Sequence, residues 1–163
     1  MFTDLRPATA ADVAAFAGWR YEPPFDVYDL TEPLDELTGY FLSPEVRCHA
    51  IETAEGLAGY CTFGQDARVP GGDYSAPALD IGAALMPSLT GRGHGARFVA
   101  TILGFAAAAF EPEAVRVSIA AANAPALRVW TANGLTETQR FHTDSPILGT
   151  TEFVILERHL TKD

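Results

Sequence analysis

The sequence has 163 residues and an ordinary globular composition, which fits one domain with enough apolar surface to bury a core. A formal net charge of −10 argues against nucleic acids and anionic membranes as main partners, and it is compatible with a cationic acceptor such as an amine. The N-terminus has no basic region followed by an apolar run, and the most apolar stretch, residues 98–110, is too short to cross a bilayer. We therefore expect a cytoplasmic protein.

The first half of the chain predicts a strand, two helices and a hairpin. Thr9 is a good N-cap because Asp12 follows three residues later, as in a variant capping box. The expected elements, in chain order, are a strand at 2–6, a helix at about 10–20, a helix capped by Thr31 and running to about Phe41, and hairpin strands at 46–53 and 57–64.

An aromatic and acidic segment lies between the two predicted helices. Pro23 and Pro24 keep it from forming a regular helix. Such a segment could wall an acceptor pocket, although its rings would equally well cap the core. The candidate acceptor-binding residues are Tyr21, Glu22, Asp26 and Tyr28.

A glycine-rich turn follows the next predicted strand, residues 79–86. The turn reads TGRGHG, and an apolar segment long enough for a buried helix, about 93–110, comes after it. Strand, glycine turn and helix in that order place backbone N–H groups at a helix N-terminus, where they bind anions and phosphates. We expect Gly91, Gly93 and Gly95 to be glycines because a Cβ would block the approach of a ligand to the backbone.

The last third predicts a strand, a short helix and two final strands. Asn123 is a good N-cap, Pro125 suits the first helical turn, and Gly134 suits the position after the helix. The expected elements are a strand at 115–120, a helix through Ala132, and strands at about 135–142 and 151–158. The order β-α-α-β-β-β-α-β-α-β-β describes one α+β domain, residues 1–163, around a mixed sheet.

These elements and two motifs resemble the GCN5-related N-acetyltransferase (GNAT) superfamily. The family motif Q/R-x-x-G-x-G/A corresponds to residues 90–95, with Thr90 in place of Gln or Arg. The family run NxxAxxxYxxxGF corresponds to residues 123–135, with Trp130 in place of tyrosine. The resemblance implies a mixed, mostly antiparallel sheet flanked by helices, in which the fourth and fifth strands splay apart.

The resemblance also implies acetyl-CoA as co-substrate and no metal. The pyrophosphate would lie on the glycine turn and the pantetheine arm along the strand before it, paired through main-chain groups. The residues implied in binding the cofactor are Leu85, Met86, Gly91, Arg92, Gly93, His94, Gly95, Asn123, Ala126 and Trp130. The acceptor would be a primary amine of a small molecule or peptide, and a homodimer is compatible with this interpretation.

Catalysis in this resemblance is direct attack of the amine on the thioester. A carboxylate on or near the fourth strand often removes the proton of the amine, and Asp80 is the nearest by position. Its other interpretation, as a structural carboxylate on the strand, has equal weight. Trp130 stands where the family often has a tyrosine that protonates the departing thiolate, and an indole is no usable acid.

Two other interpretations stay open on the sequence alone. A domain of this fold can bind acyl-CoA without useful catalysis, as a sensor, and Trp130 gives that view some weight. The string GRGHGA also fits the dinucleotide fingerprint, but several strands precede it and no βαβ repeat follows. Cys48 and Cys61 have no metal-site spacing, so we interpret both as reduced residues of strands or core.

Overall fold

The computed structural model describes residues 1–145 and 149–160. Its centre is a sheet of seven strands in the order β1-β2-β3-β4-β5-β7-β6. The strands are β1 (Arg6–Pro7), β2 (His49–Thr53), β3 (Gly56–Phe63), β4 (Leu79–Leu85), β5 (Ala114–Ala120), β6 (Thr136–Ser145) and β7 (Gly149–His159). The helices are α1 (Ala10–Ala17), α2 (Leu34–Phe41), α3 (Gly95–Phe110) and α4 (Ala124–Ala132), with short 3₁₀ turns at Phe25–Tyr28, Gln65–Ala67 and Pro87–Leu89. The predicted order of strands and α-helices is confirmed.

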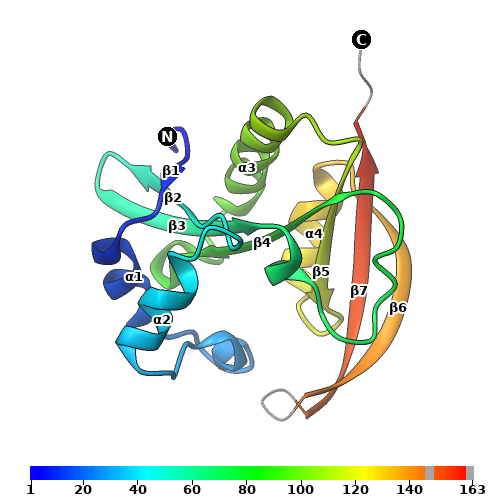
Figure 1. Ribbon diagram of the computed structural model, residues 1–163, viewed down its shortest axis with the longest axis horizontal. Helices are drawn as coiled ribbons and strands as arrows, with labels where there is room; N and C mark the ends of the chain where they lie inside the picture. Colours follow the sequence, from blue (N-terminus) through cyan, green and yellow to red (C-terminus); the bar gives the residue numbers. More distant parts are fainter. Residues whose placement is uncertain (146–148, 161–163) are drawn as a thin grey trace.

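The sheet is mixed in the expected way. Neighbouring strands run antiparallel everywhere except between β4 and β5, which are parallel. In Figure 1, β2 to β4 run across the view while β5 to β7 stand upright, so the two halves of the sheet turn away from each other. The change of direction falls at the β4–β5 junction.

Two hydrophobic cores lie on the two faces of the first half-sheet. Adjacent residues of a strand point to opposite faces, and in β3 Tyr60 packs with α1 and α2 while Cys61 packs with α3 and α4. The Phe16 ring of α1 stacks on Tyr60 with ring centroids 3.9 Å apart. Figure 1 shows the pair α1 and α2 set apart from α3 and α4. Both cysteines are buried free thiols, and burial raises the pKa of Cys48 to about 12.

Several predicted boundaries are confirmed at their caps. The Thr9 hydroxyl accepts from the Asp12 N–H, and the Asp12 carboxylate accepts from the Thr9 N–H, which completes the capping box of α1. The Asn123 side chain accepts from the Ala126 N–H and caps α4. Gly134 has a φ of 91° after the end of α4, a backbone conformation that favours glycine.

Two boundaries were predicted wrongly. Helix α2 starts at Leu34 and is capped by Pro33, not Thr31, because Pro33 keeps an extended backbone with ψ of 145°. The first strand has only the two residues Arg6 and Pro7, where it pairs with Ala50 and His49 of β2. Before it, Thr3 donates its N–H to the Glu52 carbonyl without forming a regular ladder.

Candidate active site

The site is organised by the point at which β4 and β5 separate. The two strands pair only at Leu79 with Val115 and Asp80 with Arg116, although β4 continues to Leu85 and β5 to Ala120. Beyond these two pairs the facing edges of β4 and β5 pair with no other strand in the described part of the chain. The predicted splay of the fourth and fifth strands is therefore confirmed.

The main chain of β4 is hydrogen-bonded to β3 along one edge, and its other edge faces the gap toward β5. Gly64 donates its N–H to the Asp80 carbonyl, and Met86 donates its N–H to the Ala58 carbonyl at 2.7 Å, so even-numbered residues face β3. The main-chain groups of Ile81, Ala83 and Leu85 consequently face the β5 side. Of the two expected main-chain contacts to a cofactor arm, the Leu85 N–H has no acceptor among the described residues, whereas the Met86 N–H already donates to Ala58.

The glycine turn presents unpaired backbone donors at the start of α3. The N–H groups of residues 91–97 donate to no acceptor among the described residues, as expected at a helix N-terminus that has no side-chain cap. Gly91 and Gly93 have φ of 71° and 81°, and a Cβ at either would meet nothing within 4 Å. These donors and the helix dipole together form an anion-binding nest.

Gly95 is a glycine for a different reason from the one expected. A Cβ at Gly95 would come within 2.9 Å of Cγ1 of Val129. The residue therefore permits close packing of α3 on α4, and Gly91 and Gly93 are needed for their backbone conformation. The expected reason, room for a ligand to approach the backbone, stays a prediction at Gly91 and Gly93.

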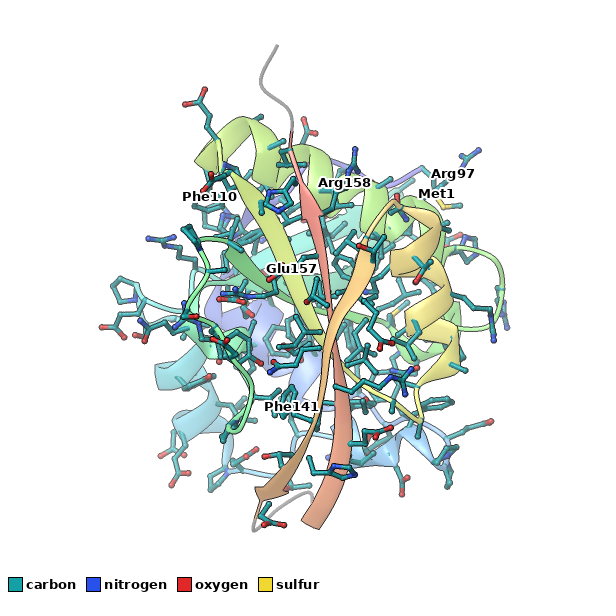
Figure 2. The ribbon with its side chains drawn as sticks, turned by 90° about the vertical axis from the view of Figure 1, so that its right-hand side faces the viewer. Met1, Arg97, Phe110, Phe141, Glu157 and Arg158 are labelled. Carbon is teal, nitrogen blue, oxygen red and sulfur yellow. The ribbon has the colours of Figure 1, made fainter. Side chains whose placement is uncertain are left out.

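Three cationic or ionisable side chains surround the turn. Arg92 and Arg97 are exposed, His94 is half-buried at the N-terminus of α3, and none of them makes an ion pair with a described residue. Arg97 lies beside Met1, and the two residues line one shallow hollow (Figure 2). The local positive charge is therefore free to meet an anion in a protein of net charge −10.

The aromatic segment contacts the ends of both separated strands. The Tyr21 hydroxyl donates to the Leu85 carbonyl at 2.9 Å, and the Tyr21 N–H donates to Asp29. Burial and the charge of Asp29 raise the pKa of Tyr21 to about 12. Burial raises the pKa of Tyr28, and the polar groups of the Asn123 side chain and the Ala120 backbone partly offset that shift.

One segment thus reaches β4 through Tyr21 and the β5–α4 junction through Tyr28. Sequence reasoning placed this segment at a site but did not rank its residues. Its two candidate carboxylates, those of Glu22 and Asp26, are both exposed.

Asp80 lies in a buried ion-pair network. Its Oδ1 accepts from Arg116 Nε at 2.6 Å, and its Oδ2 accepts from Arg116 Nη2 at 3.0 Å and Arg68 Nε at 2.8 Å. Arg116 is fully buried and also contacts Glu157 of β7 (labelled in Figure 2), and hydrogen bonding to Asp80 raises the pKa of Arg116. Three guanidinium N–H groups donate to this carboxylate, which is 3% exposed, and this favours the structural interpretation of Asp80. Its role as a base stays a prediction.

Trp130 and Ala126 lie on the inner side of α4. Trp130 is 6% exposed and belongs to the core between the sheet, α3 and α4, and Ala126 packs against the same core. The expected contact of Trp130 with a cofactor arm therefore has little surface available, and packing is its observed role.

A hollow of about 440 Å³ lies away from this site. It is lined by residues of the α2–β2 connection and by the C-terminal end of α3, including Phe41, Arg47 and Phe110. The glycine turn is at the opposite end of the same helix. Within residues 1–145 and 149–160, no group of three or more His, Cys, Asp or Glu is arranged to hold a metal ion, and no helix is long and apolar enough to cross a membrane.

Comparison with known protein families assigns this chain to one family. The sequence model of the acetyltransferase (GNAT) domain matches residues 3–136. The chain therefore belongs to the GNAT acetyltransferase family, as the two motifs predicted. A search of curated protein sequences found no match.

Solved structures with the same fold share little sequence with this chain. A chimera of Vibrio cholerae spermidine N-acetyltransferase and hSSAT has a TM-score of 0.78 at 16% identity, covering 97% of this chain and 95% of its own. The Vibrio cholerae enzyme in complex with CoA and spermine has a TM-score of 0.76 at 16% identity, with the same coverage of 97% and 95%. YncA from Salmonella typhimurium, solved with its cofactor acetyl-CoA, has a TM-score of 0.70 at 18% identity, covering 99% and 95%.

Proposed function

We propose that the protein transfers the acetyl group of acetyl-CoA to a primary amine of a small molecule or peptide. The observation that carries the proposal is the separation of β4 from β5 beside a turn whose N–H groups at 91–97 have no described acceptor. A turn with free donors suits the pyrophosphate, and the open edge of β4 suits an extended arm carrying amide groups. The family assignment supplies the reaction class.

The residues that would hold the cofactor follow from this arrangement. The backbone of residues 91–95 would take the pyrophosphate, with Arg92 and His94 adding positive charge. The Leu85 N–H would pair with the arm, and Asn123 lies at the β5–α4 junction where the arm would end. The amine nitrogen attacks the thioester carbon while both substrates are bound, and positioning supplies much of the rate.

The acceptor site would be formed by the aromatic segment. Between Arg20 and Arg47 the chain has seven Asp and Glu residues and no Lys or Arg. This negative charge favours an amine that is cationic elsewhere in its structure, and structural relatives that act on spermidine support that class. Tyr21 and Tyr28 provide apolar ring faces at the entrance, and Glu22 and Asp26 are exposed beside them.

A thermal-shift experiment tests cofactor binding. Acetyl-CoA and CoA should raise the melting temperature, and NAD should not. Gly93→Ala should abolish the shift because alanine strains the backbone at a φ of 81°. Gly39→Ala is the matched control, since a Cβ at this exposed helical glycine meets nothing within 4 Å. Stabilisation by NAD alone would contradict the proposal.

Thiol release with a panel of amines then tests the transfer itself. Polyamines, small monoamines, amino acids and peptide N-termini should be compared, and at least one should accelerate release of CoA from acetyl-CoA. Binding of acetyl-CoA without release for any amine would favour the sensor interpretation.

A further inference from the structure

Tyr21 is held in place by its main chain and by its hydroxyl. Its N–H donates to Asp29 Oδ1 at 2.9 Å, and its hydroxyl donates to the Leu85 carbonyl at 2.9 Å. A carbonyl oxygen can only accept, so the phenolic proton lies on the side of Leu85. Burial and the charge of Asp29 raise the pKa of Tyr21 to about 12, so the phenol keeps this proton at neutral pH. The hydroxyl is therefore a fixed donor to the main chain of β4.

The Leu85 carbonyl belongs to the edge of β4 that faces the gap. Leu85 lies opposite Gly59 of β3, and the next pair along, Met86 with Ala58, carries the hydrogen bond between these strands. Hydrogen-bonded and non-hydrogen-bonded pairs alternate along an antiparallel ladder, so both main-chain groups of Leu85 point away from β3. Among the described residues, no side chain other than that of Tyr21 donates to a main-chain carbonyl of β4.

A cofactor arm that lies along this edge like an additional strand would use the same carbonyl. A neighbouring strand places an amide nitrogen about 2.9 Å from the carbonyl oxygen that accepts from it. The Tyr21 oxygen already stands at 2.9 Å from the Leu85 oxygen. In the free protein, the phenol therefore takes the place of an amide nitrogen of the arm.

The same hydrogen bond attaches the aromatic segment to β4. Within residues 21–29 the chain bonds to itself, because the Phe25 N–H donates to the Glu22 carbonyl and the Asp29 N–H donates to the Asp26 carbonyl. Of the described hydrogen bonds of this segment, only that of the Tyr21 hydroxyl reaches β4. Loss of this one contact would therefore detach the segment from the strand without unfolding its turns.

We propose that the hydrogen bond from Tyr21 to Leu85 is a latch that the cofactor opens, because the arm takes the Leu85 carbonyl and the aromatic segment leaves the edge of β4. This inference rests on the proposed acetyl transfer. Since the acceptor site would be formed by the aromatic segment, the latch makes acceptor binding depend on bound cofactor. By linkage, an amine that binds the released segment raises the affinity for the cofactor by the same factor.

Titration calorimetry tests the competition without any turnover. Tyr21→Phe lacks the competing hydroxyl and should bind CoA about fivefold more tightly than the wild-type protein, as expected for one net hydrogen bond. The ligand 3′-phospho-ADP keeps the nucleotide and pyrophosphate of CoA but lacks the arm, and both proteins should bind it equally. Tyr40→Phe alters an exposed tyrosine of α2 and is the control that should bind both ligands like the wild-type protein.

Trypsin reports whether the segment leaves β4. The bond between Arg20 and Tyr21 adjoins the latch, Arg20 is exposed, and no Lys or Arg occurs between Arg20 and Arg47. CoA should speed cleavage after Arg20 several-fold in the wild-type protein, and 3′-phospho-ADP should not. In Tyr21→Phe this cleavage should be fast without ligand, and CoA should add little. Mass spectrometry of the fragment that ends at Arg20 measures the rate.

A second pair of variants keeps the hydroxyl and loosens the segment. Asp29→Ala removes the acceptor of the Tyr21 N–H, whereas Asp29→Asn removes the same charge and keeps an oxygen at that position. Asp29→Ala should therefore bind CoA more tightly than Asp29→Asn does. Thermal melting checks the fold of Tyr21→Phe, and the Asp29 pair decides the question if that variant unfolds.

The outcomes separate this inference from the proposed function. If Tyr21→Phe binds CoA more weakly and CoA slows cleavage after Arg20, the hydroxyl holds the arm in place and the latch is wrong. Equal affinity of the wild-type protein and Tyr21→Phe for CoA would also overturn it. Failure of the wild-type protein to bind CoA would overturn the proposed function and this inference together. Tight binding of CoA without acetylation of any amine would overturn the proposed transfer, while calorimetry and proteolysis would still decide the role of Tyr21.

Discussion

At the scale of single residues, the meaning of a charged side chain depends on its partner. Asp80 and Arg116 each stand within an apolar strand sequence, LDIGAAL and AVRVSIA. A lone carboxylate on a strand near a cofactor site suggests a base. The structure pairs it in register with a fully buried arginine, and the pair joins β4 to β5 at the end where these strands remain together. The sequence feature that could have predicted this pair is the opposite charge within each of two otherwise apolar strands.

Asp80→Asn should therefore mainly lower the free energy of unfolding and have a smaller effect on turnover. Removing the charge leaves Arg116 buried without its main partner, a change that costs about 3–5 kcal/mol in comparable buried pairs. Denaturant unfolding measures the loss. Glu137→Gln, which breaks an exposed pair with Arg140, is the control and should leave the unfolding midpoint unchanged. Full stability with lost turnover in Asp80→Asn would restore Asp80 as the base.

At the scale of elements, the N-terminal capping box makes the stability of α1 depend on pH. Hydrogen bonding from Arg6 lowers the pKa of Asp12, and hydrogen bonds from the Thr9 backbone and hydroxyl lower it further, against burial. A carboxyl whose pKa is lower in the folded state contributes stability above its unfolded pKa of about 4, and this contribution disappears as the pH falls through the folded pKa.

Asp12→Asn should weaken the dependence of the free energy of unfolding on pH in the acid range. The free energy of unfolding of the wild-type protein should fall steeply below about pH 4. The free energy of unfolding of Asp12→Asn should be smaller at neutral pH and should fall less with acid. Urea unfolding at a series of pH values measures both curves. Asp4→Asn, which alters an exposed carboxylate outside the cap, should reproduce the wild-type curve. Parallel curves for Asp12→Asn and wild type would contradict the assignment.

The contact between α3 and α4 depends on the small size of Gly95. Gly95→Ala places a Cβ 2.9 Å from Cγ1 of Val129, so we expect a loss of about 1–3 kcal/mol and weaker CoA binding as the turn shifts. Val129→Ala removes the clashing carbon, and the double variant should recover part of both losses. A double-mutant cycle measured by unfolding and by CoA titration tests this coupling. Additive effects in the cycle would show that the two residues do not interact.

At the scale of the whole molecule, the net charge of −10 acts differently on the two proposed substrates. The protein as a whole repels anionic CoA, and binding depends on short-range donors of the glycine turn. A cationic acceptor is attracted over a longer range, and salt screens that attraction because the Debye length shrinks to about 8 Å at physiological ionic strength.

The KM for a polyamine acceptor should therefore rise with salt, while the KM for a small monoamine should change much less. Steady-state kinetics at constant pH, with ionic strength varied by an inert salt, measures both values. Equal salt dependence for the two amines would remove electrostatic attraction as a basis for acceptor choice.

The sequence by itself determined the local elements and the glycine turn. Glycines, prolines and caps act through the backbone of their own neighbours, so the start of α1, the start of α4, the glycine turn and the element order could all be predicted. The two motifs then gave the family. The two misplaced boundaries, at Thr31 and at the first strand, are places where a proline and a missing ladder partner outweighed the local pattern.

Only the tertiary structure decided the partners of the functional side chains. Asp80 meets Arg116 across 36 residues of sequence, and Tyr21 meets Leu85 across 64. No local pattern encodes a contact between such distant residues, because it arises from the pairing of strands and the path of a loop over them. The same reason explains Gly95, whose small size is required by a valine on another helix.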